Sequence, residues 1–263
     1  MLIDTHCHLD AEEFAGDRDA VVLAAHVAGV EATVVPAVGP TNWAAVRECC
    51  AHYPRHYPAY GIHPLYIDGP DVSVLPTLRR WITTELDTAT LPVAIGEIGL
   101  DFFVPGQDVE RQVFFFVEQL KVARDLNLPI LLHVRRAVDQ VLKCLRRIGV
   151  RGGIAHAFNG SVQQAEAFIR LGFKLGFGGA MTYPRSLRIR QLAMDLPLEA
   201  LVLETDAPDI PPSWLAGKRN RPAELARIAS VLAELRGLST DEVAHATSRN
   251  ALAVLPLSDD SAM

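Results

Sequence analysis

Short apolar runs alternate with amphipathic stretches along the whole chain. The runs VAIGEI, PILLHV and LVLETD are almost entirely apolar until a polar residue near their ends, which is typical of parallel strands buried on both faces. Between two of these runs, the stretch 108–126 has a helical repeat of apolar positions on one predicted buried face: Val109, Val113, Phe116, Val117, Leu120 and Ala123. The pattern therefore predicts strands and helices in alternation.

Eight strands are predicted, and the spacing leaves room for a helical crossover of at least ~10 to 12 residues between neighbours. They span residues 2–5, 32–37, 57–61, 93–98, 130–134, 153–156, 173–177 and 201–204. No linker or low-complexity tract interrupts the series, so we expect an α/β protein with a single-domain (β/α)₈ TIM-like barrel over residues 1–263. An open, doubly wound parallel sheet is the alternative.

The composition indicates a globular chain with enough material for a large core. Of the 263 residues, 49% are hydrophobic and 21% are charged, which excludes disordered and fibrous classes. A net charge of −6 excludes a protein that binds polyanions over its whole surface. Any contact with nucleic acid is therefore expected to be local.

The N-terminal and cysteine patterns favour a cytoplasmic protein. The chain is polar from Asp4 onward, where a signal peptide would need a basic start and an apolar stretch. Apolar runs fall short of the ~20 residues that span a membrane. The four cysteines show no CxxC spacing and are expected to be reduced core thiols. The sequence indicates no membrane association and no obligate protein partner.

Polar residues suited to metal binding recur at the ends of the predicted strands. In a barrel these ends meet at one face, where active sites form. The residues concerned are His6, His8, His63, Glu97, His133, His156, Glu204 and Asp206.

His6 and His8 form a histidine pair two residues apart, which an extended chain places on one face. One metal ion can bind both, and Asp4 is expected to orient an imidazole from behind. Taken alone, the pair also fits two histidines satisfied in the core.

Glu97 lies within an apolar strand, where a carboxylate carries a heavy desolvation cost unless it is paired or bound to metal. Binuclear hydrolases need an anionic bridge between the ions, often a carboxylated lysine, but residues 81–107 contain neither lysine nor arginine. We therefore predict that Glu97 is the bridge. A hydrogen bond to a neighbouring strand is the alternative.

His133 and His156 end consecutive apolar strands and fit a ligand pair for a second metal, although each alone also fits a core histidine. Asp206 is predicted to coordinate metal and to act as the general base, and its alternative is a helix N-cap. Glu204 is predicted to support a ligand as a neighbouring carboxylate.

Together these segments resemble the TatD family of metal-dependent deoxyribonucleases, within the amidohydrolase superfamily. The resemblance rests on DTHCHLD (4–10), GIHP (61–64), GEIGLD (96–101), LPILLHVRR (128–136), HAFNG (156–160), LETDAP (203–208) and Asn250. It implies a distorted barrel that binds two divalent ions, the first through His6, His8 and Asp206, the second through His133 and His156, with Glu97 shared. It also implies DNA hydrolysis, commonly as a 3′ to 5′ exonuclease.

Loop residues after the predicted strands are candidates for phosphate binding. The groups are Arg135 with Arg136, Tyr183 with Arg185, and Lys218 with Arg219 and Arg221. Arg135 can alternatively pair with a structural carboxylate. His63 is expected to contact a phosphate or an additional metal, or else to be satisfied within its loop. Gly176, Gly178 and Gly179 fit either close approach to a ligand or a turn.

A DNA phosphodiesterase acting on single-stranded DNA or 3′ ends is the leading hypothesis. A metallohydrolase of another ester, such as a lactone, a phosphorylated metabolite or an aminoacyl-tRNA ester, is the second, and metal binding without catalysis is the third. Four imidazoles suit Zn²⁺, whereas phosphodiester chemistry commonly uses Mg²⁺ or Mn²⁺.

Overall fold

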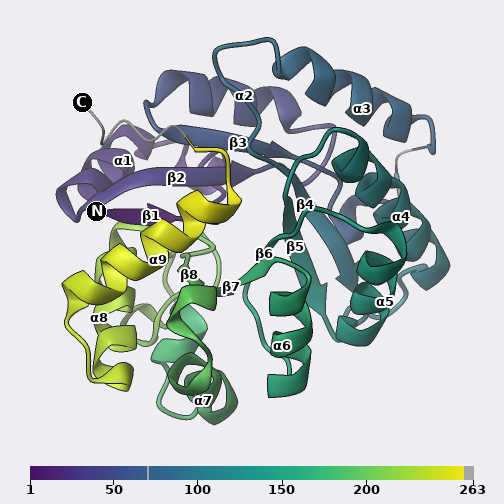
Figure 1. Ribbon diagram of the computed structural model, residues 1–263. Helices are drawn as coiled ribbons and strands as arrows, with labels where there is room; N and C mark the ends of the chain where they lie inside the picture. Colours follow the sequence, from purple (N-terminus) through teal and green to yellow (C-terminus); the bar gives the residue numbers. More distant parts are fainter. Residues whose placement is uncertain (70, 258–263) are drawn as a thin grey trace.

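The computed structural model describes residues 1–69 and 71–257, so the last six residues of the predicted domain lie outside the described part. Eight parallel strands form one sheet in sequential order, with helices around it (Figure 1). The strands are β1 Leu2–Asp4, β2 Val30–Pro36, β3 His56–Tyr60, β4 Ala94–Asp101, β5 Ile130–Arg135, β6 Gly153–Ala155, β7 Phe173–Phe177 and β8 Leu201–Leu203.

The predicted (β/α)₈ barrel is confirmed, and the doubly wound alternative is wrong. In a doubly wound sheet the strand order reverses, whereas here each strand pairs with its neighbours in sequence. The backbone N–H of Thr5 donates to the Leu203 carbonyl at 3.1 Å and links the first and last strands. Residues 173–177 form β7 as predicted, while β4 extends to Asp101, three residues beyond its predicted end.

Each of the seven crossovers between successive strands contains one of the helices α1 to α7, and α8 and α9 follow the last strand. The helices are α1 Arg18–Val27, α2 Trp43–His52, α3 Val74–Glu85, α4 Val109–Asp125, α5 Val138–Ile148, α6 Val162–Arg170, α7 Leu187–Asp195, α8 Leu225–Arg236 and α9 Thr240–Val254. Short 3₁₀ turns are η1 Glu12–Phe14, η2 Pro64–Tyr66, η3 Gly179–Thr182, η4 Leu198–Ala200, η5 Ser213–Leu215 and η6 Pro222–Glu224.

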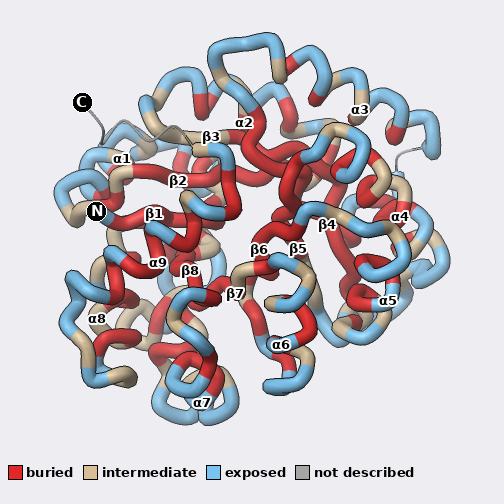
Figure 2. Tube along the Cα trace, viewed as in Figure 1, coloured by how far each residue is buried: buried red, intermediate tan, exposed pale blue. Residues whose placement is uncertain are grey.

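Two apolar layers stabilise the barrel, and buried residues run along its strands (Figure 2). The inner layer fills the end where the strands begin, and α9 covers that end through Ala251 and Val254. Asn250 donates from its side-chain amide to the carbonyls of Leu198 (2.8 Å) and Leu201 (2.7 Å). Asn250 therefore ties α9 to the base of the barrel and keeps this end covered.

The outer layer lies between the strands and the surrounding helices. On α4, Phe116 and Leu120 are fully buried as the helical repeat predicted, but Val109 is 46% exposed. The prediction is wrong at Val109, which lines an open surface pocket beside Phe102 instead of packing in the core.

A β-bulge in β4 turns Glu97 toward the barrel interior. Ile95 of β4 pairs with Ile130 of β5, and Ile98 pairs with Leu132. Between these two pairs, β4 therefore contains one residue more than β5. Ile95 belongs to the outer layer, so regular alternation would turn Glu97 outward as well. The extra residue reverses that direction. Gly96 permits it, since a Cβ atom there would lie 2.5 Å from a side-chain carbon of β5.

Asp4 joins β1 to the chain after β8, which differs from its predicted role behind an imidazole. Its carboxylate accepts hydrogen bonds from the backbone N–H (2.9 Å) and the hydroxyl (2.6 Å) of Thr205, and from the backbone N–H of His6 (3.3 Å). Neither ring nitrogen of His6 makes a hydrogen bond to Asp4 or to any other described residue. Asp4 thus positions the backbone that carries His6 rather than its ring.

The four cysteines are all unpaired and buried. Among the described residues, no helix combines the length and apolar character that a membrane span requires.

Thr205→Val tests the seam. The substitution keeps the shape of the side chain but leaves a buried carboxylate of Asp4 without its hydroxyl donor, so the free energy of unfolding should fall by about 1–3 kcal/mol. Urea denaturation measures it. The control is Thr247→Val, because the Thr247 hydroxyl donates within α9 to the Val243 carbonyl (2.8 Å) rather than to a carboxylate. Equal losses in both variants would contradict a special role for the seam.

Candidate metal centre

Side chains from the strand ends converge on a cleft of about 1280 Å³ at the open end of the barrel. The cleft is lined by His8, His63, Glu97, His133, His156 and Asp206, and His6 lies behind them with no exposed surface. The structure therefore brings together every residue that the sequence predicted as a metal ligand.

Glu97 lies at the centre, and its two carboxylate oxygens face different imidazoles. Oε2 lies 3.3 Å from Nε2 of His6 and 3.7 Å from Nε2 of His8. Oε1 lies 2.9 Å from Nδ1 of His133 and 3.9 Å from Nε2 of His156. One buried carboxylate can therefore serve two ligand groups at once.

Asp206 divides its oxygens in a similar way. Its Oδ1 lies 3.6 Å from Nε2 of His6 and 3.7 Å from Nε2 of His8, while Oδ2 lies 3.8 Å from Nε2 of His156. Asp206 thus faces the first ligand group, as predicted, and also reaches toward the second.

Acceptors behind two imidazoles fix the nitrogen that faces the centre. Nδ1 of His8 lies 3.2 Å from the Pro36 carbonyl, and Nδ1 of His156 lies 3.1 Å from Glu204 Oε1. Donation from Nδ1 leaves the Nε2 lone pair of each ring directed inward, as a metal ligand requires. Glu204 has the geometry expected of a supporting carboxylate.

Glycines on and after β7 make room for neighbouring chain rather than for a ligand. A Cβ atom on Gly176 would lie 2.1 Å from Glu204 Oε2, and one on Gly178 would lie 2.7 Å from the Glu204 carbonyl oxygen. At Gly179, a Cβ atom would lie 2.2 Å from the carbonyl oxygen of Ile210. All three glycines therefore let the segment after β8 approach β7 closely.

Asp101 is a site residue to which the sequence interpretation gave no role. Its Oδ2 lies 3.2 Å from Nε2 of His133, so it can hold this ring as Glu204 holds His156. Its other oxygen accepts from the backbone N–H groups of Phe103 (2.8 Å) and Val104 (3.2 Å). Its position at the end of a strand, four residues after Glu97, was the available signal.

The charges of the cluster depend on one another. Burial alone raises the pKa of Glu97, but the imidazoles of His63 and His6 and the hydrogen bond from His133 lower the pKa by more, to well below its usual value. Burial lowers the pKa of His156, yet the carboxylates of Asp206 and Glu204 raise it to about 10. A proton on His156 thus balances the carboxylates, and a divalent cation, which binds deprotonated imidazole, would balance them in its place.

The donor set fits divalent metal ions. His6 is fully buried, and neither ring nitrogen makes a hydrogen bond to a described residue although Nε2 faces two carboxylates. Such an orphaned nitrogen fits a cation ligand. Within the described chain, three groups have ligand atoms close enough to share an ion: His6 with His8 and Glu97, His6 with His156 and Asp206, and His63 with Glu97 and His133.

His63 differs from His8 and His156 in the ring nitrogen that carries the proton. Its Nδ1 accepts a hydrogen bond from the backbone N–H of Leu65 (3.2 Å), and burial lowers its pKa to about 3. A neutral ring that accepts at Nδ1 carries its proton on Nε2, which lies 3.7 Å from Glu97 Oε1. A proton on Nε2 favours a role for His63 as a hydrogen-bond donor rather than as a metal ligand.

The predicted basic rim is only partly at the cleft. Arg135 and Arg136 line it, and so does Arg188, which the sequence interpretation did not select. Tyr183 and Arg185 are not among the lining residues, and the Tyr183 hydroxyl donates to the Pro211 carbonyl at 3.0 Å.

The third predicted group also lies away from the cleft. Arg219 pairs with Asp17 at 2.6 Å, and Arg221 pairs with Glu224 at 2.9 Å. Lys218 is exposed and does not line the cleft. Local carboxylates hold both arginines, so our expectation that this group faces the site is corrected.

Comparisons with known proteins agree over nearly the whole chain. A family model described as TatD related DNase matches residues 3–256. The protein named "Uncharacterized metal-dependent hydrolase YjjV" of Escherichia coli K12 is 43% identical over 249 residues, which cover 94% of this chain and 95% of that protein. "Putative deoxyribonuclease tatdn3" of Danio rerio is 33% identical over 262 residues, with 95% of each chain covered. The crystal structure of YjjV, a TatD homologue from E. coli, has a TM-score of 0.93 at 41% identity and 98% coverage of both chains.

Glu97→Gln tests the shared carboxylate. The variant keeps the shape of the side chain but loses the negative charge that faces both ligand groups, so it should fold and bind fewer ions per chain than the unaltered protein. Elemental analysis after dialysis against Mn²⁺ measures the stoichiometry. Glu85→Gln is the matched control, because Glu85 is equally buried (3% exposed) but faces Arg47 at 3.6 Å. Unchanged stoichiometry in Glu97→Gln would refute the assignment.

Proposed function

The chain belongs to the family of TatD-related DNases, and from this membership we propose that it is a divalent-metal-dependent hydrolase that cleaves DNA phosphodiester bonds from the 3′ end. The relatives named as a metal-dependent hydrolase and as a deoxyribonuclease support the reaction class. The side chains of the site support metal-dependent hydrolysis, and the size of the cleft favours a large substrate.

The observation that carries the proposal is the division of the Glu97 oxygens between two groups of imidazoles. This arrangement suits two ions held ~3.5 to 4 Å apart, as in two-metal phosphodiesterases. Bound Mg²⁺, Mn²⁺ or Zn²⁺ would supply Lewis-acid activation and neutralise charge at the phosphate. His6, His8 and Asp206 would hold one ion, His133 and His156 the other, and Glu97 both.

Asp206 accepts the proton of the attacking water in this proposal. Its side chain is 13% exposed, so it borders both the ligand imidazoles and the cleft. A carboxylate in this place can take a proton as the new bond to phosphorus forms, which is general base catalysis.

His63 and the arginines bind the phosphate. His63 presents a protonated Nε2 beside Glu97, so it can donate to a non-bridging phosphate oxygen. Arg135 and Arg136 line the same cleft and suit bidentate contacts with backbone phosphates.

The size of the cleft favours a polymer over a small ester. Its volume of about 1280 Å³ exceeds the ~300 to 1,000 Å³ of ordinary small-molecule pockets. Lactones and phosphorylated metabolites would leave most of this space unused, and a strand of several nucleotides would fill it.

We also propose a cytoplasmic location. The support is the set of four buried, unpaired thiols, which are stable in a reducing compartment.

The direct test is hydrolysis of a single-stranded oligonucleotide labelled at its 5′ end, with Mn²⁺ present. Trimming from the 3′ end should give a ladder of labelled products, and chelation should stop it. A panel of lactones, phosphate monoesters and an aminoacyl ester is assayed in parallel. Turnover within that panel without DNA cleavage would contradict the proposal.

Asp206→Asn separates proton transfer from metal binding. Asparagine keeps a coordinating oxygen but cannot accept the proton, so kcat should fall by roughly 10² to 10⁴ while DNA binding persists. The measurement is kcat at saturating Mn²⁺ across pH 5 to 9. The control variant is Asp195→Asn, which changes an exposed carboxylate on α7. If excess metal restored the full rate, Asp206 would be a ligand only.

A further inference from the structure

Phe103 is an exposed aromatic residue on the wall of the cleft. It is 43% exposed and lines the cleft together with His133, Arg135 and Arg136. Exposed aromatic surface beside a cleft marks a candidate binding surface, and next to a site for nucleic acid it can contact an unpaired base.

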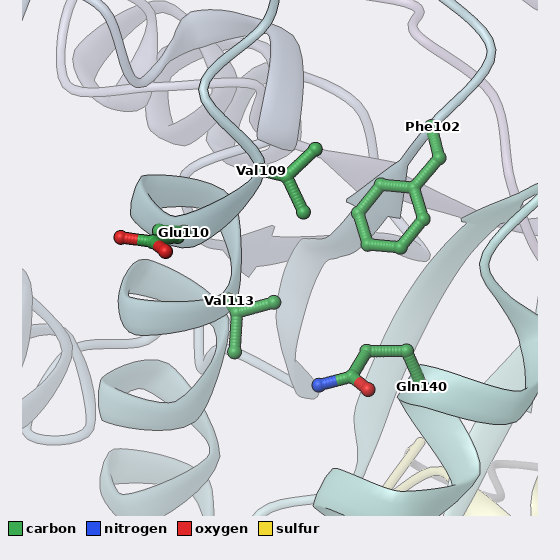
Figure 3. A pocket seen from close by; sticks show the side chains of 5 residues that line it. All are labelled: Phe102, Val109, Glu110, Val113 and Gln140. Carbon is green, nitrogen blue, oxygen red and sulfur yellow. The ribbon is translucent and has the colours of Figure 1, made fainter.

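The neighbouring Phe102 points the other way and anchors the loop. Figure 3 shows its ring facing Val109 and Val113 of α4, with Gln140 of α5 nearby, while the Glu110 carboxylate points away. These residues line a mainly apolar pocket of about 390 Å³. Phe102 thus fixes the loop on its outer side, and Phe103 is presented on the side of the cleft.

The Phe103 backbone is tied to a ligand of the metal centre. Its N–H donates to Asp101 Oδ1 at 2.8 Å, and the other oxygen of Asp101 lies 3.2 Å from His133 Nε2. One carboxylate therefore positions both the imidazole and the aromatic residue, so the distance from the ring to the reacting centre is held by a short chain of contacts.

Two guanidinium groups lie over the Phe103 ring. The Cζ atoms of Arg135 and Arg136 lie 3.7 Å and 4.7 Å from the ring centroid. No carboxylate in residues 1–69 or 71–257 forms an ion pair with either arginine. Their positive charges therefore remain available to phosphates at the same place as the aromatic surface.

From this juxtaposition we infer that Phe103 is a base-stacking residue: its open surface packs on an unpaired nucleobase near the 3′ end, and Arg135 and Arg136 bind the adjoining backbone phosphates. The inference rests on the proposed DNA hydrolysis and names a residue that recognises the nucleotide. Because a base cannot stack on Phe103 while it is stacked within a duplex, the contact selects frayed or single-stranded ends. Stacking tolerates any base, so little sequence preference is expected.

The experiment compares oligothymidylates of five nucleotides with and without a base at one position. The linkages are phosphorothioates, which resist hydrolysis, and an abasic nucleotide is placed in turn at each of the last three positions. The Mn²⁺-loaded protein should bind the complete oligonucleotide about 5- to 150-fold more tightly than one of the abasic forms. In Phe103→Ala this ratio should fall close to one, and in Phe103→Trp it should persist.

Matched variants separate stacking from charge and from general damage. Phe114 is 46% exposed on α4 and does not line the cleft, so Phe114→Ala should keep the full ratio. Arg135→Ala should weaken binding of complete and abasic oligonucleotides alike and reduce the salt dependence by about one phosphate contact.

The outcomes separate this inference from the proposed function. If the unaltered protein binds and trims DNA but Phe103→Ala keeps the same base-dependent ratio, the stacking role is wrong and the proposed function stands. If the unaltered protein neither binds nor trims DNA, both fail. A ratio lost in Phe103→Ala and kept in Phe114→Ala and Phe103→Trp supports the inference.

Discussion

The constraint on which the site depends is the burial of the Glu97 carboxylate, which is only 3% exposed. A buried carboxylate needs strong partners, and here five imidazoles face it from the ends of several strands. A parallel barrel is an efficient way to bring so many side chains together, because the carboxyl ends of all its strands meet at the same face. The bulge at Gly96 turns the carboxylate inward, so backbone geometry and site chemistry are specified together.

A second set of contacts holds the site from outside. Asp206 adopts a φ of +58°, in a region that costs a non-glycine residue roughly 1–2 kcal/mol. Its backbone N–H donates to the His6 carbonyl (2.8 Å), and the Asn220 amide donates to the Thr205 carbonyl (2.8 Å). The loop after β8 is thereby fixed against β1. The same seam that closes the barrel also sets the position of the proposed proton acceptor.

Much of this arrangement could be predicted from the sequence, because apolar runs that end in a histidine or a carboxylate show both a strand and its functional end. The β4 bulge could not, since a register shift has no signature in alternating polarity around Glu97. Contacts between segments that are far apart in the sequence could not be predicted either. Asp4 accepts hydrogen bonds from Thr205, about two hundred positions away, and Arg219 forms an ion pair with Asp17. The aromatic surface of Phe103 was missed because its exposure depends on how one loop packs.

We propose that Glu97 bridges two metal ions. Anomalous diffraction from crystals of the Mn²⁺-loaded protein tests it directly, because each ion appears as a separate peak beside identified ligands. We predict two peaks ~3.5 to 4 Å apart, with Glu97 Oε2 on the ion beside His6 and His8 and Oε1 on the ion beside His133. A single peak, or two peaks with both Glu97 oxygens on the same ion, would contradict it.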